Sequence, residues 1–283
     1  MEKLYNFQKI FNNFISDFLK HDVFYEKIHN SLSYSVINGG KRLRPWIIYE
    51  LGLYENISER NLLLSGTAVE ILHTSTLIHD DLPSIDNSDL RRGNPTNHKV
   101  FGESSAVLAG DYGFLYPLKI FDLLDADKNV KYNINNLYTD TVLKIFEGES
   151  MDVSFETTEN ISLEETEKMY LFKTGVLFGF SFSIPFIISR KADFMKYYDI
   201  GCRFGKAFQI YDDIKDLTSD EISLGKDTGK DVNKKTYVSH YGIKKSNENA
   251  DKIFESVTDD LKSCGLENFS FTLQNIKNYI KNR

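Results

Sequence analysis

The residues most suited to chemistry begin with an aspartate cluster in the first third of the chain. Asp80, Asp81 and Asp86 follow a long apolar stretch. His73, Thr76 and Asp80 are spaced by three and four residues, so a helix would place them on one face. Polar side chains aligned on one face of an otherwise apolar helix indicate that this face is directed toward a polar ligand.

A second cluster consists of Asp212, Asp213 and Asp216, which share a helical face with Gln209. Neighbouring carboxylates repel one another unless a cation neutralises them. Oxygen donors of this kind suit Mg²⁺, which takes a few carboxylates together with waters and substrate phosphates. One acidic cluster is commonly a solvated helix end. Two clusters, each after an apolar helix and each beside basic loops, favour a magnesium site.

Basic residues accompany both clusters. A Gly-Gly turn carries Lys41, Arg42 and Arg44. Arg91 and Arg92 directly follow the first aspartate cluster. The second cluster is followed by Lys226, Lys230, Lys234 and Lys235. A lone basic run is usually a solvated face. Cations on both sides of the acidic clusters are what a metal–diphosphate site requires, because they bind some phosphate oxygens while Mg²⁺ bridges others.

Composition excludes several other classes. The net charge of −7 and the pI of about 5.5 argue against a nucleic-acid partner. Cys202 and Cys264 have no disulfide or metal spacing and are expected to be free thiols in a reducing compartment. The N-terminus lacks the features of a signal peptide, and no stretch approaches the roughly 18 apolar residues of a membrane span. We therefore expect a cytoplasmic protein.

The elements that must position these clusters are helices. Apolar residues recur at spacings of three and four along most of the chain, which predicts helices over 5–19, 61–79, 133–148, 164–188, 194–217, 246–262 and 270–281. No run alternates as a strand would, and no composition shift marks a domain boundary. The sequence predicts one all-α domain over residues 1–283, with charged loops at 38–45, 81–98 and 223–236 as the functional segments.

These motifs together resemble the trans-isoprenyl diphosphate synthase (polyprenyl synthetase) family, of the bacterial farnesyl and geranylgeranyl type. The resemblance spans roughly residues 35 to 242. In chain order the motifs are GGKRLRP at 39–45, EILHTSTLIHDDLPSIDNSDLRRGNPTNHKVFGE at 70–103, LAGD at 108–111, KTG at 173–175, FQIYDDIKD at 208–216, SLGKDTGKD at 223–231 and KKTYVSHYG at 234–242. The family implies a bundle of ten or more helices around a central substrate cavity.

The resemblance also implies roles for individual residues. Mg²⁺, three ions per active site with substrate bound, would be held by Asp80, Asp86 and Asp212, with support from Asp81, Asp213 and Asp216. The allylic diphosphate would bind Arg91, Lys173, Lys226 and Lys234. Isopentenyl diphosphate would bind Lys41, Arg44, His73 and Arg92. Lys173, Thr174 and Gln209 would be catalytic, the last two lining the reacting carbons.

The implied function is a short-chain trans-prenyltransferase. It would condense isopentenyl diphosphate with dimethylallyl, geranyl or farnesyl diphosphate by ionisation, condensation and elimination, and it would work as a homodimer. Three alternative functions fit these motifs less well. A non-catalytic regulatory subunit of a prenyltransferase should have lost one of the aspartate motifs or a key basic residue, and this chain keeps them. A terpene cyclase has no use for a second diphosphate site. A metal-dependent phosphohydrolase, suggested by His79 and Asp80, would need further histidine ligands.

Product length depends on the floor of the expected cavity. Bacterial farnesyl synthases place an aromatic residue five positions before the first aspartate, where this chain has Ser75, followed by Thr76. This favours the twenty-carbon geranylgeranyl product over the fifteen-carbon farnesyl product, and Ser75→Tyr is expected to shorten it. Aromatic residues of neighbouring helices could close the same space: Tyr112, Phe114, Tyr116, Phe178, Phe180 and Phe182.

The chain departs from the family at two positions near these motifs. Glu149 stands where relatives commonly have glutamine, and Tyr211 stands where they often have glutamine. Neither departure is expected to abolish activity.

Overall fold

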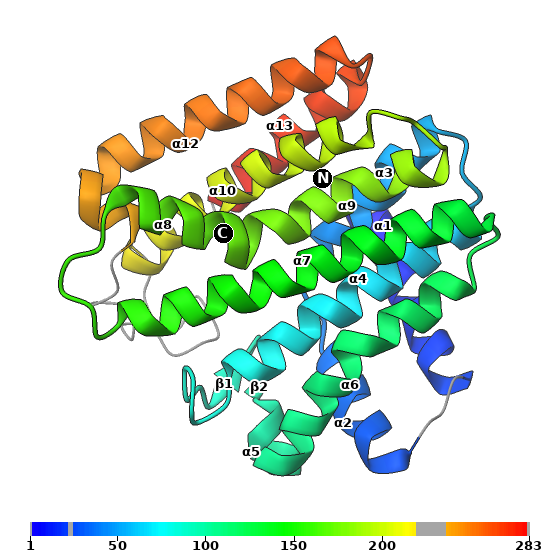
Figure 1. Cartoon of the computed structure of the whole chain (residues 1–283), viewed down its shortest axis with the longest axis horizontal. Coiled ribbons are helices and arrows are strands. Elements are labelled where there is room, and N and C mark those ends of the chain that lie inside the picture. The colour runs from blue at the N-terminus through cyan, green and yellow to red at the C-terminus, as the bar shows by residue number, and fades with distance from the viewer. Residues whose placement is uncertain (1, 22–24, 219–235, 282–283) are drawn as a thin grey trace. The chain divides into compact units, whose positions relative to one another are not determined.

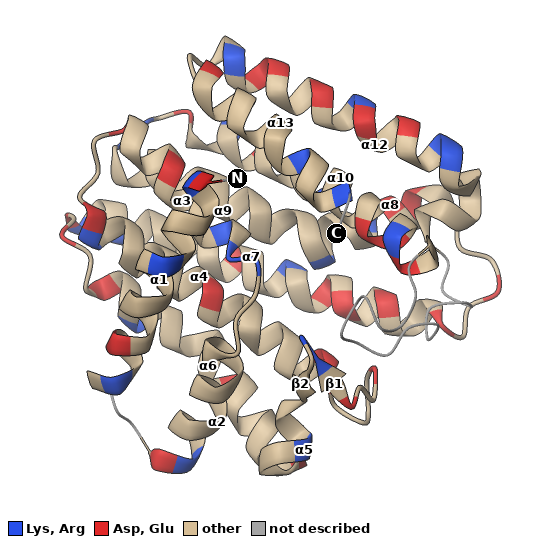
Figure 2. Cartoon of the chain, turned by 180° about the vertical axis from the view of Figure 1, so that it is seen from behind, with Lys and Arg blue, Asp and Glu red and all other residues tan. Residues whose placement is uncertain are grey.

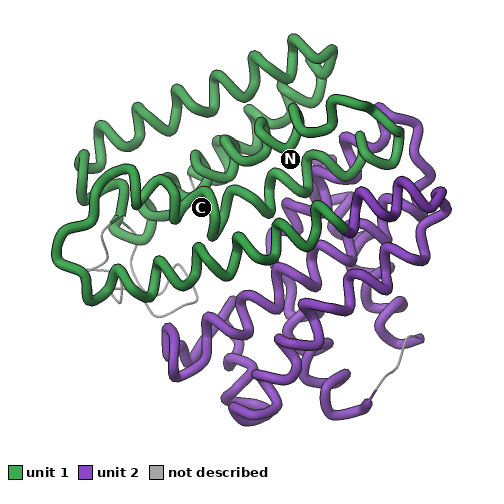
Figure 3. The backbone as a smooth tube through the Cα atoms, in the orientation of Figure 1, with its two compact units in different colours: residues 1, 136–219, 229–283 green, residues 2–135, 220–228 purple. Residues whose placement is uncertain are grey.

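Helices make up most of the described residues, 2–21, 25–218 and 236–281, in a computed structural model (Figure 1). The expected all-α class is confirmed. The helices gather into two compact units (Figure 3). Unit 1 contains residues 136–219 and 229–283, and unit 2 contains residues 2–135 and 220–228, so α7 (Lys128–Phe155) begins in unit 2 and ends in unit 1. The single domain over 1–283 stays a prediction.

Unit 2 is built around α4. Its helices are α1 (Glu2–His21), α2 (Glu26–Ile37), α3 (Leu43–Tyr54), α4 (Glu59–Asp80), α5 (Asn97–Phe101) and α6 (Glu103–Asp122). The Ser58 side chain caps α4 by accepting a hydrogen bond from the Asn61 amide. Helix α4 is buried along most of its length, as the sequence predicts, because α2, α3 and α6 pack around it. Its last turn therefore delivers the first aspartate cluster on a rigid support.

A short hairpin follows α4 in unit 2. Strands β1 (Leu90–Arg91) and β2 (Asn94–Pro95) pair antiparallel, with Arg91 opposite Asn94. Arg92 and Gly93 form the turn, with φ angles of 56° and 77°, which is the backbone of a tight two-residue hairpin. This hairpin lies inside the segment 81–98, which the sequence predicts only as a loop.

Unit 1 holds the second aspartate cluster on α10. Its elements after α7 are α8 (Leu163–Tyr170), the π-helix η1 (Leu171–Gly175), α9 (Val176–Ile188), α10 (Phe194–Thr218), α12 (Tyr237–Ser263) and α13 (Glu267–Lys281). Helix α10 packs against α9 through aromatic side chains, with the Phe178 and Phe204 ring centres 5.0 Å apart. The expected helix over 164–188 is a continuous helical stretch in which α8, the π-helix and α9 follow one another. A π-helical turn within an α-helix is often found at functional sites.

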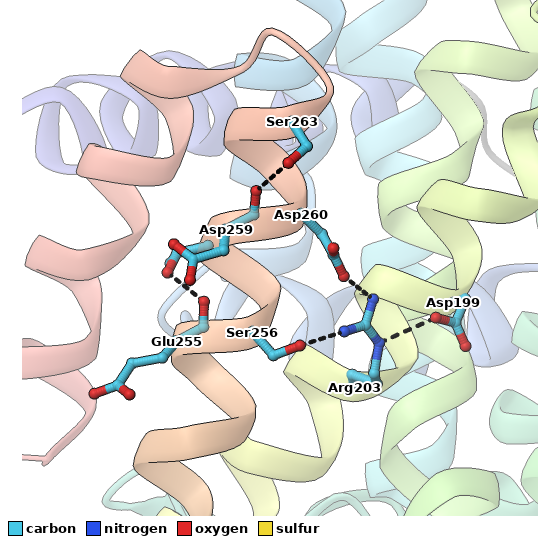
Figure 4. Close-up of polar contacts among 8 residues, drawn as sticks. Asp199, Arg203, Glu255, Ser256, Asp259, Asp260 and Ser263 are labelled. Atoms are coloured by element: carbon cyan, nitrogen blue, oxygen red, sulfur yellow. Dashed lines mark hydrogen bonds and ion pairs between the residues drawn. The ribbon is translucent and has the colours of Figure 1, made fainter.

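Polar contacts fix α12 to α10 at the surface of unit 1. The Arg203 guanidinium donates hydrogen bonds to Asp199 at 3.0 Å, to Ser256 at 2.9 Å and to Asp260 at 2.6 Å (Figure 4). Helix α12 carries charges of both signs, whereas α9 carries none (Figure 2). In unit 1, α9 therefore belongs to the apolar core, and α12 presents charged side chains.

One helical stretch, Leu163–Ile188, is long and apolar enough to cross a membrane by length and composition. The sequence-based expectation that no stretch approaches this threshold is therefore wrong. In the structure, 78% of the apolar window is buried inside the protein. That burial is typical of the core helix of a soluble fold.

Candidate active site

The Gly-Gly turn before α3 and the hairpin after α4 meet within unit 2. Arg92 of the hairpin donates a hydrogen bond to the Gly39 carbonyl. A Cβ atom on Gly40 would lie 2.7 Å from the Arg92 guanidinium carbon, so only glycine permits this approach. The turn and the hairpin therefore bring Arg92 to the segment that carries Lys41 and Arg44. We call Lys41, Arg44, His73 and Arg92 the basic cluster.

His73 shows that the electrostatic field in this part of unit 2 is positive. Burial, followed by the charges of Arg44, Arg92, Arg91 and Arg42, lowers the pKa of His73 well below its usual 6.5. The imidazole is therefore neutral at pH 7. Its ring N–H can donate a hydrogen bond to a phosphate oxygen, while the surrounding guanidinium groups supply the positive charge.

Arg42 has a different role from its neighbours Lys41 and Arg44. Its side chain is buried and donates hydrogen bonds to Glu70 of α4 at 2.5 Å, to the Val36 carbonyl at 2.7 Å and to Asn12 at 2.9 Å. Its φ of 50° starts α3 from the left-handed region. Arg42 thus fixes the turn that carries the basic cluster, a role that sequence reasoning missed. The buried acid Glu70 in an apolar helix was the available signal.

The first aspartate cluster surrounds the end of α4. Asp80 and Asp86 lie close together in the fold, because the Asp86 amide donates a hydrogen bond to the Asp80 carbonyl at 2.9 Å. Asp81 is buried, and its two carboxylate oxygens both accept from Arg91 Nε at 2.8 Å. Burial raises the pKa of Asp81, and the bonds from Arg91 oppose that rise. Asp81 therefore positions Arg91, which fits a supporting role better than direct metal binding.

Ser75 and Thr76, the expected length-determining residues, lie differently on α4. Ser75 is fully buried, and its hydroxyl donates to the Ile71 carbonyl at 2.9 Å. A Cβ atom on Gly113 of α6 would lie 1.9 Å from that hydroxyl, so α4 and α6 touch at this point. Thr76 is half-buried, and its hydroxyl donates to the His73 carbonyl at 2.8 Å. Position 75 therefore has packing reasons of its own for a small side chain.

In unit 1, a chain of hydrogen bonds joins the π-helix to the second aspartate cluster. Thr174 donates to Gln209 at 2.7 Å, and Gln209 donates to Asp213 at 2.9 Å. The hydroxyl of Tyr170 donates to the other oxygen of Asp213 and accepts from the Tyr237 amide at 2.8 Å. The structure thus brings Thr174, Gln209 and Asp213 together, as expected. Tyr170 was missed because nothing in the sequence marks it.

Lys173 projects from the same π-helix toward α7. Its ammonium group lies 2.7 Å from Glu149 and 2.6 Å from Asp152. We call Glu149, Asp152 and Lys173 the carboxylate–lysine cluster. Tyr211, beside the second aspartate cluster, donates to Asp251 of α12 at 2.7 Å. The expected residues Lys226 and Lys234 lie outside the described residues.

Comparisons with known proteins identify the family of the chain. A family model described as polyprenyl synthetase matches residues 25–265. The chain belongs to the polyprenyl synthetase family. A geranylgeranyl diphosphate synthase of Cyanophora paradoxa is 33% identical over 264 residues, which cover 90% of this chain and 87% of the relative.

Two solved structures share the polyprenyl synthetase fold with this chain. A geranyltranstransferase of Thermotoga maritima is 39% identical, with a TM-score of 0.84 and coverage of 98% of this chain and 99% of the other. A geranyltransferase of Helicobacter pylori complexed with magnesium and isoprenyl diphosphate is 27% identical, with a TM-score of 0.81 and coverage of 100% and 97%. These relatives confirm the expected family and enzyme class, a prenyltransferase of the short-chain trans type. They give no support to a regulatory subunit or a terpene cyclase.

Proposed function

We propose that this polyprenyl synthetase condenses isopentenyl diphosphate with allylic diphosphates in a Mg²⁺-dependent reaction that yields geranylgeranyl diphosphate. The observation that carries the proposal is the basic cluster, which lies in the same unit as the first aspartate cluster. Lys41, Arg44, His73 and Arg92 suit a second diphosphate, which a cyclase does not need. Isopentenyl diphosphate is the substrate that these residues would hold.

The aspartates would hold the metal. Among the described residues, no three His, Cys, Asp or Glu side chains gather closely enough to bind a metal by themselves. Mg²⁺ takes one or two carboxylates and completes its shell with waters and phosphate oxygens. Asp80, Asp86 and Asp212 would be the direct ligands, and Asp81, Asp213 and Asp216 would support them. A full site would hold three ions. Bound Mg²⁺ would neutralise charge on the departing diphosphate.

The remaining residues would orient the substrates and stabilise charge. Lys173 and Arg91 would bind the allylic diphosphate. The oxygens of Thr174 and Gln209 already lie 2.7 Å apart and would steady the allylic cation through their negative dipole ends. The double bond of isopentenyl diphosphate would attack that cation. The released diphosphate would then remove a proton to restore an allylic product.

Product length is proposed to be twenty carbons. Ser75 and Thr76 are both small, and the Cyanophora relative is named for a twenty-carbon product. The alternative is fifteen carbons, because the Thermotoga relative is named for transfer of a geranyl group. Adding five carbons to a ten-carbon geranyl group gives that length.

The protein is proposed to be a cytoplasmic homodimer. Three apolar side chains of α6 are exposed, namely Val107, Leu108 and Leu115, the last by 67%. On α7, Leu143 and Phe146 are also exposed, by 57% and 45%. Burial against a second copy would remove this apolar surface from water. Sedimentation of the wild type should give a dimer and that of Leu115→Glu a monomer, and a monomeric wild type would contradict the proposal.

The test of the function is elongation by the purified protein. It is incubated with Mg²⁺, labelled isopentenyl diphosphate and each of dimethylallyl, geranyl and farnesyl diphosphate, and the dephosphorylated products are sized. Elongation that stops at twenty carbons supports the whole proposal. A fifteen-carbon end point supports the transferase function and contradicts the proposed twenty-carbon length. Failure to consume isopentenyl diphosphate with any primer overturns the function.

A further inference from the structure

Two carboxylates share one ammonium group in the carboxylate–lysine cluster. Glu149 and Asp152 lie three residues apart on one face of α7, and both reach the Lys173 ammonium. The side chains of Lys173, Glu149 and Asp152 are only 25%, 19% and 12% exposed. Charges shielded in this way interact more strongly than those of surface pairs.

The backbone holds this arrangement in place. A Cβ atom on Gly148 would lie 2.3 Å from the Lys173 amide nitrogen, so α7 touches the π-helix directly. The positions of Glu149 and Lys173 are therefore set by main-chain packing. Removing the charge of Glu149 should leave that packing intact.

One carboxylate oxygen of Glu149 accepts no hydrogen bond among the described residues. Its Oε2 atom bonds Lys173, while its Oε1 atom is buried and has no hydrogen-bond partner among the described residues. A buried carboxylate oxygen without a donor is costly. Glu149 therefore depends on Lys173 for much of its stabilisation, and it opposes the loss of that ammonium to another anion.

We propose that Glu149 weakens binding of the allylic diphosphate by competing with it for the Lys173 ammonium group. This rests on the proposed function, which assigns Lys173 to that diphosphate. The diphosphate that leaves the allylic substrate would remain at Lys173 after the reaction, so the competition also favours its release. Glu149 is thus a residue that sets affinity, and it takes no part in the chemical step.

The binding test uses geranyl thiolodiphosphate, in which sulfur replaces the oxygen between carbon and phosphorus so that the leaving group departs slowly. Titration calorimetry with Mg²⁺ compares the wild type, Glu149→Gln, Lys173→Gln and the double variant. Glutamine keeps the shape of Glu149 and removes its charge. The matched control is Glu147→Gln, because Glu147 is exposed on α7 and no ion pair joins it to Lys173 among the described contacts.

Glu149→Gln is expected to tighten binding roughly three- to tenfold, as for loss of one partly shielded competing charge. Glu147→Gln should leave binding unchanged. In the Lys173→Gln background, Glu149→Gln should give no further gain. Unchanged or weaker binding in Glu149→Gln overturns the proposal. So does an equal gain in the Lys173→Gln background, because the effect would then be a general charge effect.

Kinetics separate this proposal from the proposed function. In elongation assays the KM for geranyl diphosphate should fall with Glu149→Gln, and the KM for isopentenyl diphosphate should stay within about twofold. If the wild type elongates and the KM for geranyl diphosphate does not fall, the role of Glu149 alone is wrong. If the wild type does not elongate, the function fails, and the role of Glu149 in binding the allylic diphosphate fails with it.

Discussion

The basic cluster of unit 2 and the carboxylate–lysine cluster of unit 1 differ in the charged groups that contact them. Around His73, four arginines are close enough to lower its pKa, so positive charge dominates. Around Lys173, two carboxylates contact one ammonium group. A diphosphate can enter the first environment directly. Beside Lys173 we expect a diphosphate to bind together with divalent cations, because its oxygens would otherwise meet the carboxylates of Glu149 and Asp152.

The two clusters are also supported differently. The turn that carries the basic cluster is fixed by a buried ion pair between Arg42 and Glu70. Lys173 is fixed by contact of the α7 backbone with the π-helix, and the neighbouring α10 is tied to α12 by Asp251. Each support offers a way to disturb one cluster without touching the other.

The largest expected effect follows from removing the support of the basic cluster. Arg42→Met leaves Glu70 buried without its cation, which should cost about 3–5 kcal/mol in the free energy of unfolding. Denaturant unfolding measures this. The double change Arg42→Met with Glu70→Leu should recover most of the loss, because both charges are then gone. A loss below about 1 kcal/mol in the single variant would show that the Arg42–Glu70 ion pair contributes little to the free energy of unfolding.

The next effect tests the aspartates. Asp80→Asn and Asp212→Asn should each lower kcat by about 10²–10³-fold, because charge stabilisation of the leaving group is lost. Both should also raise the Mg²⁺ concentration that gives half-maximal rate. Asp199→Asn is the control, since Asp199 is an exposed residue of α10 paired with Arg203. An unchanged Mg²⁺ requirement in the first two variants would contradict their assignment as ligands.

A smaller effect separates the two substrates. Arg44→Gln should raise the KM for isopentenyl diphosphate by roughly thirtyfold, since a charge-assisted contact to phosphate is lost. The KM for the allylic substrate should change little. Arg203→Gln, which removes an arginine from the surface of unit 1, should alter neither constant. An equal rise in both KM values after Arg44→Gln would contradict the division between the clusters.

The smallest effect concerns the support of α10. Burial alone would raise the pKa of Asp251, but hydrogen bonds from Lys277, Lys281 and Tyr211 outweigh it and lower the pKa to about 2. The folded state therefore favours the ionised carboxylate. Its contribution is complete above the ordinary pKa of 3.8 and is lost as the pH falls toward about 2.

Asp251→Asn tests this contribution. The variant should lose about 1 kcal/mol of unfolding free energy at pH 7, because the side chain is partly exposed. The difference from the wild type should shrink below pH 4. Asp259→Asn, which removes a largely exposed carboxylate paired with Lys262, should show no such trend. A difference between Asp251→Asn and the wild type that stays constant down to pH 3 would contradict the shift.

Much of the fold could be predicted from strongly periodic segments. Helix α4, α10 and the stretch from α8 to α9 appear where apolar spacing placed them, with boundaries shifted by a few residues. Helix α6 was missed because its sequence contains two glycines and Pro117. It is helical because those small residues let it approach α4, as at Gly113, and that partner is invisible in the sequence of α6 itself.

The composition of the site could be predicted better than its contacts. The aspartates and most basic residues were found because their types and spacing are distinctive. Sequence spacing could not show that Arg42 is buried and bonded to Glu70 whereas Lys41 and Arg44 are half-buried. Nor could it pair Lys173 with Glu149, because that contact depends on how α7 meets the π-helix. Contacts between distant segments require the packed structure.

We expect the basic cluster to bind isopentenyl diphosphate without metal and the carboxylate–lysine cluster to bind the allylic diphosphate only together with Mg²⁺. Calorimetric titration of isopentenyl diphosphate and of geranyl thiolodiphosphate, each with Mg²⁺ and with a chelator, tests it most directly. We predict that isopentenyl diphosphate binds with similar affinity in both conditions and that the allylic analogue loses most of its affinity without metal. Loss of isopentenyl diphosphate binding on chelation, or metal-independent binding of the allylic analogue, would contradict the account.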